Sequence, residues 1–213
     1  EEREGALSVI GAVSPPGGDI SEPVTQNTLR IVKIFWKLDY DLSYQRHFPA
    51  INWIDSYSLY QPKIDAYLDE NIDRRFSKLR KRSMALLQEE TSLLEVVRLV
   101  GRDSLSDEDQ MKLHTSKSIR EDFLQQNAFH DVDTFCPLEK QFKMLDTILY
   151  FYDRGQEALV KGAYFSEIEE LEVKENIARM KYVPNDELEK LDEIKDKIDS
   201  QLKNLVEVGD TDA

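Results

Sequence analysis

Apolar residues recur every three or four positions along most of the chain after Pro62, a spacing that places them on one face of an α-helix. The pattern predicts helices over residues 62–70, 73–90, 91–100, 106–125, 138–157, 165–178 and 185–206. The stripe of the last helix consists of Leu188, Leu191, Ile194, Ile198, Leu202 and Leu205. Such a stripe favours packing within a bundle, and an interface with a partner's helix is the alternative.

The start of the chain has a different pattern. Residues 6–13 are apolar and partly β-branched, and a Pro- and Gly-rich turn follows them, which favours a buried strand. Helical spacing then extends to about Asp39, with Ser21 or Thr25 as the capping residue. Residues 46–53 have the pattern of an extended segment.

These elements divide the chain into two parts. One or two strands cannot form a stable sheet by themselves, so residues 1–60 are predicted to be the remnant of an α/β domain whose other strands lie elsewhere. We expect the N-terminal part of that domain to be missing from this chain. Residues 61–213 are predicted to form a helical bundle, and the fold class is therefore mainly α.

Composition narrows the functional classes. The chain has 213 residues, and 42 Asp and Glu against 28 Lys and Arg give a net charge of −14, which argues against partners such as nucleic acid or anionic lipid. The basic segment 74–82 therefore favours a solvated helix face. No apolar run approaches the ~18 residues that a membrane span needs. The single cysteine, Cys136, excludes an internal disulfide framework.

No catalytic constellation is evident in the pattern. The chain contains no Gly-Lys-Ser/Thr sequence, and its three histidines lie far apart, so neither a phosphate loop nor a metal cluster is predicted. The aromatic residues Phe48, Phe129 and Phe135 lie outside the helical stripes. Such residues can form a slot for a flat ring, but the pattern alone favours core packing.

Several segments resemble one family over long, nearly continuous runs. The segments are Ser8–Asp19 (SVIGAVSPPGGD), Ser21–Lys33 (SEPVTQNTLRIVK), Arg46–Trp53 (RHFPAINW), Ser56–Ser58 (SYS), Gln125–Phe129 (QQNAF) and Asp133–Pro137 (DTFCP). Together they are similar to the catalytic A subunit of archaeal A-type and related V-type rotary ATPases. Residues 26–30 resemble the archaeal and bacterial branch more than the eukaryotic one.

The resemblance implies a subunit that makes or hydrolyses ATP while ions cross a membrane, with ATP or ADP and Mg²⁺ as ligands. It implies a B subunit partner in an alternating A3B3 ring, central stalk subunits, and a peripheral place on the cytoplasmic side of the cell membrane without direct membrane contact. The phosphate loop and catalytic acids of the family precede Glu1, so this chain alone is expected to be inactive. The alternatives are a non-catalytic helical scaffold or adaptor and the regulatory B subunit.

The resemblance also assigns roles to residues. An aromatic before Pro-Ala stacks on adenine in this superfamily, and here that position is Phe48; Phe129, Val132 and Phe135 would complete the pocket. An acidic loop would contact the central stalk, and it comprises Asp103, Ser104, Leu105, Ser106, Asp107, Glu108 and Asp109. A second stalk contact would involve Asp19, Ser21 and Glu22.

Overall fold

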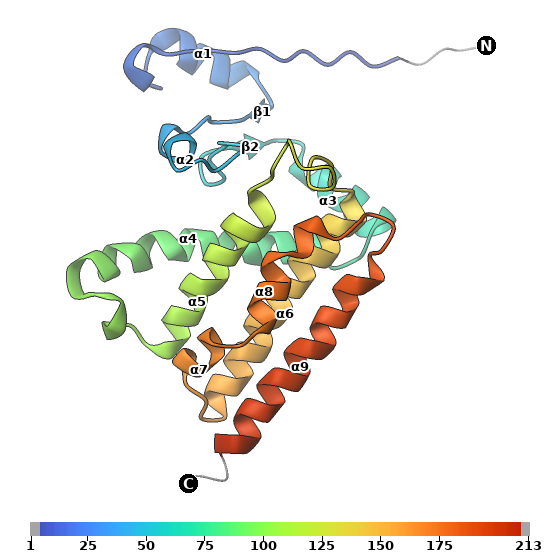
Figure 1. Ribbon diagram of the computed structural model, residues 1–213. Helices are drawn as coiled ribbons and strands as arrows, with labels where there is room; N and C mark the ends of the chain where they lie inside the picture. The colour runs from blue at the N-terminus through green and yellow to red at the C-terminus, as the bar shows by residue number, and fades with distance from the viewer. Residues whose placement is uncertain (1–4, 210–213) are drawn as a thin grey trace.

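The chain is mainly helical in a computed structural model, which describes residues 5–209 (Figure 1). The α-helices are α1 (Pro23–Ile31), α2 (Tyr40–Tyr44), α3 (Gln61–Asn71), α4 (Phe76–Val100), α5 (Asp107–Ser118), α6 (Leu138–Val160), α7 (Phe165–Glu169), α8 (Val173–Ala178) and α9 (Glu189–Gly209). Short 3₁₀ helices are η1 (Pro16–Gly18), η2 (Arg102–Ser104) and η4 (Met180–Tyr182), and η3 (Ile119–Leu124) is a π-helix that continues α5. The strands are β1 (Ile34–Phe35) and β2 (Tyr57–Ser58).

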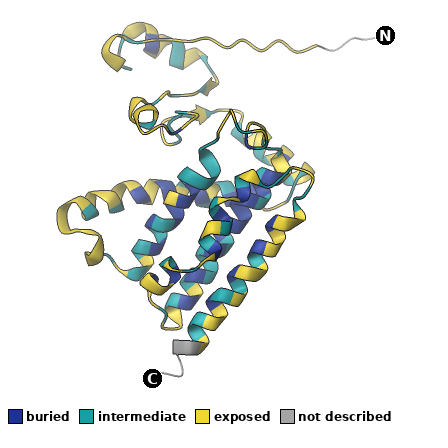
Figure 2. Ribbon diagram, viewed as in Figure 1, coloured by how far each residue is buried: buried dark blue, intermediate teal, exposed yellow. Residues whose placement is uncertain are grey.

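The core lies around α6, which packs against α4, α5 and α9. Buried residues are concentrated along the facing sides of these helices, and the outer faces are exposed (Figure 2). On α9 the residues Leu191, Ile194, Ile198 and Leu202 are buried, and Leu188 packs against the same core. The stripe predicted from the sequence is therefore a packing face within the bundle.

Three predicted stretches of the helical part are divided differently in the structure, and the last helix begins at Glu189 instead of residue 185. The expected helices 73–90 and 91–100 form one helix, α4, because no Gly or Pro interrupts the chain between them. The expected helix 106–125 changes from α to π geometry at Ile119. The expected helix 165–178 is broken between α7 and α8, where the Val173 backbone N–H donates to the Gln201 Oε1 of α9 at 3.0 Å.

The predicted strand at residues 6–13 is wrong: these residues are extended but pair with no other segment of the described chain. Leu7 is 91 % and Ile10 is 87 % exposed. A strand needs neighbours for its backbone groups and its apolar face. In residues 5–209 the only sheet is the two-stranded antiparallel pair of β1 and β2, in which Ile34 lies opposite Ser58.

The predicted helix up to Asp39 ends at Ile31. Beyond it, bonds to a distant segment replace the helical ones: Leu59 N donates to Lys33 O, Asn52 N to Lys37 O, and Asp39 N to Ala50 O. An isolated bridge between Leu38 and Ile51 continues this pairing. The apolar stripe had no surface to pack against, since Trp36 and Leu38 are exposed, and long-range pairing determined the conformation instead.

Ion pairs account for much of the basic segment 74–82. Arg80 pairs with Asp65 at 3.1 Å, Arg82 pairs with Asp153 at 2.5 Å, and Arg75 contacts Asp146 at 3.2 Å. These partners lie on α3 and α6, so the arginines join helices and are not simply a solvated face. Within residues 5–209, none of the helices is both long and apolar enough to cross a bilayer.

Candidate functional site

His47 attaches the loop that carries Phe48 to the helical part of the chain. The His47 side chain is buried, and its Nε2 lies 2.8 Å from the Arg120 carbonyl oxygen of η3. The His47 ring also lies 5.5 Å from that of Trp53. Arg46 has a left-handed φ of 58°, and the Phe48–Pro49 peptide is cis. Phe48 itself is 50 % exposed.

A second loop, residues 125–137, carries Phe129 and Phe135. Its buried centre is Asp133, whose Oδ2 accepts a 2.6 Å bond from the Asn127 backbone N–H. The His130 Nδ1 accepts from the backbone N–H groups of Val132 (3.1 Å) and Asp133 (3.3 Å). The side chains therefore satisfy the backbone of the loop and leave Phe129 99 % and Phe135 67 % exposed.

The two loops are joined to each other. The Gln126 N–H donates to the Phe48 carbonyl oxygen at 2.7 Å, although the two residues are far apart in the chain. Gln126 Nε2 also donates to the Asp133 carbonyl at 2.6 Å, so Gln126 makes hydrogen bonds to both loops. Both loops lie at the end of the helical body that faces α2 and β2 (Figure 1).

Two lysines hold this assembly on the bundle. Lys181 Nζ donates to the carbonyls of Glu121 (2.7 Å), in η3, and Gln125 (3.2 Å), the first residue of the second loop. Lys140, which is fully buried on α6, donates from Nζ to the carbonyls of Lys181 (2.8 Å) and Val183 (2.7 Å). Because charge-assisted bonds to backbone oxygen are strong, the aromatic loops are rigidly supported.

This arrangement suits the binding of a flat ring. The exposure of Phe48, Phe129 and Phe135 overturns the core-packing interpretation that the pattern alone favoured. The nearby Cys136 is a poor nucleophile, because burial raises the pKa of its thiol. Over the described part of the chain, no cluster of three or more His, Cys, Asp or Glu is arranged to hold a metal ion. Exposed rings on fixed loops can instead stack on a flat apolar ligand.

The acidic loop is at the opposite end of α5. Ser106 caps α5, since its Oγ accepts from the Asp109 N–H at 3.2 Å. The Asp107 carboxylate accepts from the Phe165 N–H at 3.2 Å, and Arg102 pairs with Glu169 at 3.0 Å. Asp103 and Glu108 remain exposed, and the loop projects from the bundle beside the end of α4 (Figure 2). The capped helix start that the sequence predicts is confirmed.

The third group of predicted site residues lies at the start of α1. The Asp19 Oδ1 accepts from the Ser21 N–H (2.9 Å) and hydroxyl (2.6 Å). Glu22 is the cap of α1, because its Oε2 accepts from the Thr25 N–H at 2.8 Å. The predicted cap, Ser21 or Thr25, is therefore wrong: a longer carboxylate reaches the free N–H, and Thr25 is the donor.

Comparison with known proteins matches both parts of the chain. Residues 65–169 match the family model described as the C-terminal domain of V and A type ATP synthase. Residues 1–58 match the nucleotide-binding domain of the ATP synthase alpha/beta family. The V-type ATP synthase alpha chain of Clostridium botulinum (strain Okra / Type B1) is 58% identical over 209 residues, which are 98% of this chain and 35% of that protein. The chain is homologous to V-type ATP synthase alpha chains.

A second alpha chain, from Thermoanaerobacter pseudethanolicus, is 56% identical over 213 residues, or 100% of this chain and 36% of that protein. The chain thus spans about a third of the length of the alpha chains that it matches. These relatives are bacterial, so the expectation of an archaeal protein is not supported, and only the broader archaeal and bacterial branch agrees with them.

The fold has a counterpart among solved structures. The ATP synthase subunit NeqB from Nanoarcheaum equitans superposes with a TM-score of 0.55 and 23% identity, covering 65% of this chain and 32% of that one. At this identity the likeness concerns the fold alone.

Three residues that hold the aromatic loops in place could not be identified from the sequence. The roles of His47, Lys140 and Lys181 in fixing the aromatic loops depend on partners far away in the chain. The one available signal was a lysine inside an apolar helical stretch, as at Lys140, where a charge at a core position needs a partner.

Proposed function

We propose that this chain is the C-terminal part of a rotary ATPase catalytic subunit and that its two aromatic loops form the adenine pocket. Phe48, Phe129 and Phe135 would enclose the base, with Val132 at the floor. The observation that carries the proposal is the 2.7 Å bond from Gln126 N–H to the Phe48 carbonyl, which holds the two loops together. The whole subunit would synthesise or hydrolyse ATP as ions cross a membrane.

The physical chemistry of adenine fits these loops. Adenine is a flat, weakly polar ring that gains stacking and apolar burial between aromatic faces without any charge on the protein. Three exposed rings on fixed loops would lose little conformational entropy on binding it. Mg²⁺ and the phosphates would be held by parts of the subunit outside this chain, which contains no Gly-Lys-Ser/Thr.

Replacing Phe48 by alanine in the complete, assembled enzyme tests the pocket. Loss of one stacking face should raise KM for ATP by about tenfold and leave assembly intact. The matched control is Tyr67→Ala, which removes an exposed ring of α3 and should leave KM unchanged. Equal KM values for the wild type and Phe48→Ala would refute the assignment.

We further propose that residues 1–60 and 61–213 are the separate structural parts of this segment, placed in an alternating A3B3 ring with B subunits. The ring would be peripheral, on the cytoplasmic side of the cell membrane. The family of the chain supports this placement, because the alpha-chain relatives are named as components of an ATP synthase.

The acidic loop 103–109 is proposed to contact the central stalk, with Asp19, Ser21 and Glu22 as a second contact. Its support is geometric: the loop projects from the bundle beside the exposed apolar side chains of Leu99 and Val100. Charge there is available to a basic partner, since Asp103 is exposed and Glu108, which is also exposed, pairs with Lys112 of its own helix at 3.3 Å.

Charge reversal tests the stalk contact. Asp103→Lys combined with Glu108→Lys should slow ATP-driven rotation in the assembled complex, because the substitutions would repel a basic surface of the stalk. Glu193→Lys, on the exposed face of α9, is the control that changes charge elsewhere. Unchanged rotation in the double variant would exclude an electrostatic contact at this loop.

A further inference from the structure

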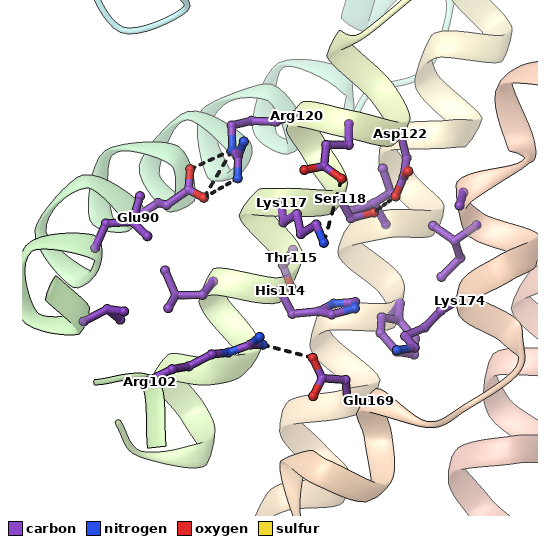
Figure 3. Close-up of a pocket in the computed structure, with 18 residues that line it drawn as sticks. Glu90, Arg102, His114, Thr115, Lys117, Ser118, Arg120, Asp122, Glu169 and Lys174 are labelled. Atoms are coloured by element: carbon purple, nitrogen blue, oxygen red, sulfur yellow. Dashed lines mark hydrogen bonds and ion pairs between the residues drawn. The ribbon is translucent and has the colours of Figure 1, made fainter. Parts of the chain in front are cut away.

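A pocket lies in the helical domain, and none of the residues that line it belongs to the aromatic loops. Its volume is about 400 Å³, and it lies between α4, α5 with η3, α6 and α8 (Figure 3). Its apolar wall is formed by Leu94, Val97, Leu113, Ile148, Phe151 and Ile177. Sites for small molecules are typically of this size and are mostly apolar with few polar groups.

The acids of this cavity are already engaged. Glu90 accepts a bidentate contact from Arg120 at 3.0 Å, and Glu169 accepts from Arg102 at 3.0 Å. The Asp122 carboxylate accepts from the Ser118 hydroxyl at 2.6 Å, and Glu121 lies 3.9 Å from Lys117. Lys174 differs from the other cations of the wall, because it has no ion pair with any residue of the described chain.

His114 lies beside this unpaired cation. Figure 3 shows its ring and the Lys174 side chain pointing toward one another across the cavity. The His114 Nδ1 is buried without a hydrogen-bond partner. Burial, followed by the charge of Lys174, lowers the pKa of His114 to about 4, so the ring is neutral at pH 7 and has one N–H to donate.

Charges of both signs surround Lys174. Burial lowers the pKa of Lys174. The charges of Glu169 and Glu170 raise it, and those of Lys117 and Arg102 lower it. An anion placed beside Lys174 would pair with an ammonium group that has no ion pair in the described chain, and it could also accept from the His114 ring. The apolar wall in turn requires an uncharged body on the same ligand.

We propose that this cavity binds a small organic carboxylate with an apolar body, whose carboxylate accepts hydrogen bonds from Lys174 Nζ and from the His114 ring. The apolar chain would lie along Leu113, Ile148 and Phe151. The site is separate from the adenine pocket and does not depend on the nucleotide proposal.

Calorimetric titration of the chain with octanoate at pH 7.4 in Tris chloride tests the site. Octanoate should bind, and Lys174→Met should weaken it by about tenfold or more, since a charge-assisted bond is lost. Lys174→Arg should retain binding. The matched control Lys63→Met removes an exposed lysine of α3 and should leave the affinity unchanged.

Two further ligands test separately whether the site needs the charge and the apolar chain of octanoate. Octan-1-ol keeps the chain but lacks the charge, and inorganic phosphate keeps charge without the chain, so both should bind at least about tenfold more weakly than octanoate. A thermal melt of each variant verifies folding. Octanoate that binds equally to wild type and Lys174→Met, equal binding of octan-1-ol or phosphate, or no octanoate binding to the folded chain would each overturn the assignment.

Discussion

Individual buried polar side chains hold the aromatic loops on the bundle and join segments within the bundle. Lys140 is the extreme case, because it is fully buried and its ammonium group is satisfied by two carbonyls of the 181–183 turn. Burial of a charge is tolerated only with such partners. These two bonds hold the η4 turn, and with it Lys181 beside the aromatic loop.

His114 should make stability depend on pH. Its pKa is about 4 in the folded chain and about 6.5 when unfolded, so the unfolded state binds the proton more readily. The contribution of neutral His114 to the free energy of unfolding is fully present above pH 6.5. It is lost as the pH falls toward 4, and the total loss is up to about 3 kcal/mol. Urea denaturation at pH 7 and pH 5 should reveal this loss in the free energy of unfolding.

The variant His114→Phe isolates this term. Phenylalanine suits the site, where the His114 ring already lies 5.9 Å from Phe151 and 6.2 Å from Phe165. Its stability should fall less than that of the wild type between pH 7 and pH 5. Parallel pH profiles for the two chains would show that His114 does not titrate in this range.

Residue identities alone predicted some of these roles and missed others. The cap at Ser106 was predictable, because a hydroxyl followed by acids is a local signal. The exposure of Phe129 was not, since an aromatic ring in a loop is compatible with both core and surface. The family resemblance, and not the pattern, favoured the surface position.

At the scale of elements, helices with a long apolar stripe were predicted well, and short elements were not. The apolar stripe of α9 predicted this helix correctly, because the stripe packs against α6. Residues 6–13 have the composition of a strand, but the described chain offers them no neighbouring strand. The sequence pattern indicates which apolar face a segment could bury. Whether the segment forms the predicted strand or helix depends on a neighbouring element being present to cover that face.

Gly155 shows how closely two elements approach. A Cβ added at this position of α6 would overlap the terminal methyl of Met111, a fully buried residue of α5. Gly155→Leu should therefore destabilise the chain by about 1–3 kcal/mol, despite the better helix propensity of leucine. The free energy of unfolding in urea measures the loss.

A double-mutant cycle supplies the control. Met111→Ala removes the side chain that meets the new group, so the pair Met111→Ala and Gly155→Leu should be more stable than the sum of the single effects. Strict additivity would mean that the two positions do not compete for the same space.

At the scale of the whole molecule, the isolated chain should neither hydrolyse ATP nor bind it tightly. The 213 residues contain no Gly-Lys-Ser/Thr sequence to anchor the phosphates, and phosphoryl transfer depends on such groups and on Mg²⁺. Phosphate-release assays should give background rates, and added Mg²⁺ should not tighten ATP binding. Turnover that disappears with a substitution inside this chain would contradict the prediction.

The sequence could indicate both parts of the molecule but not how they meet. The family-like runs lie on both sides of residue 60, and the helical pattern predicts the second part. The contact between the loops of Phe48 and Gln126 joins positions that no local pattern relates. Such contacts arise only when the folded helices bring η3 beneath the first part of the chain.

The π-helical continuation of α5 makes one stiff rod of residues 107–124. One end begins at the acidic loop, and the other carries the Arg120 carbonyl that contacts His47, directly beneath Phe48. At about 1.5 Å per residue the rod is roughly 25 Å long, so a tilt of about 10° at one end displaces the other by roughly 4 Å. Because the Arg120 carbonyl contacts His47 and the Gln126 N–H donates to the Phe48 carbonyl, a displacement of that size would carry both aromatic loops together with the end of the rod.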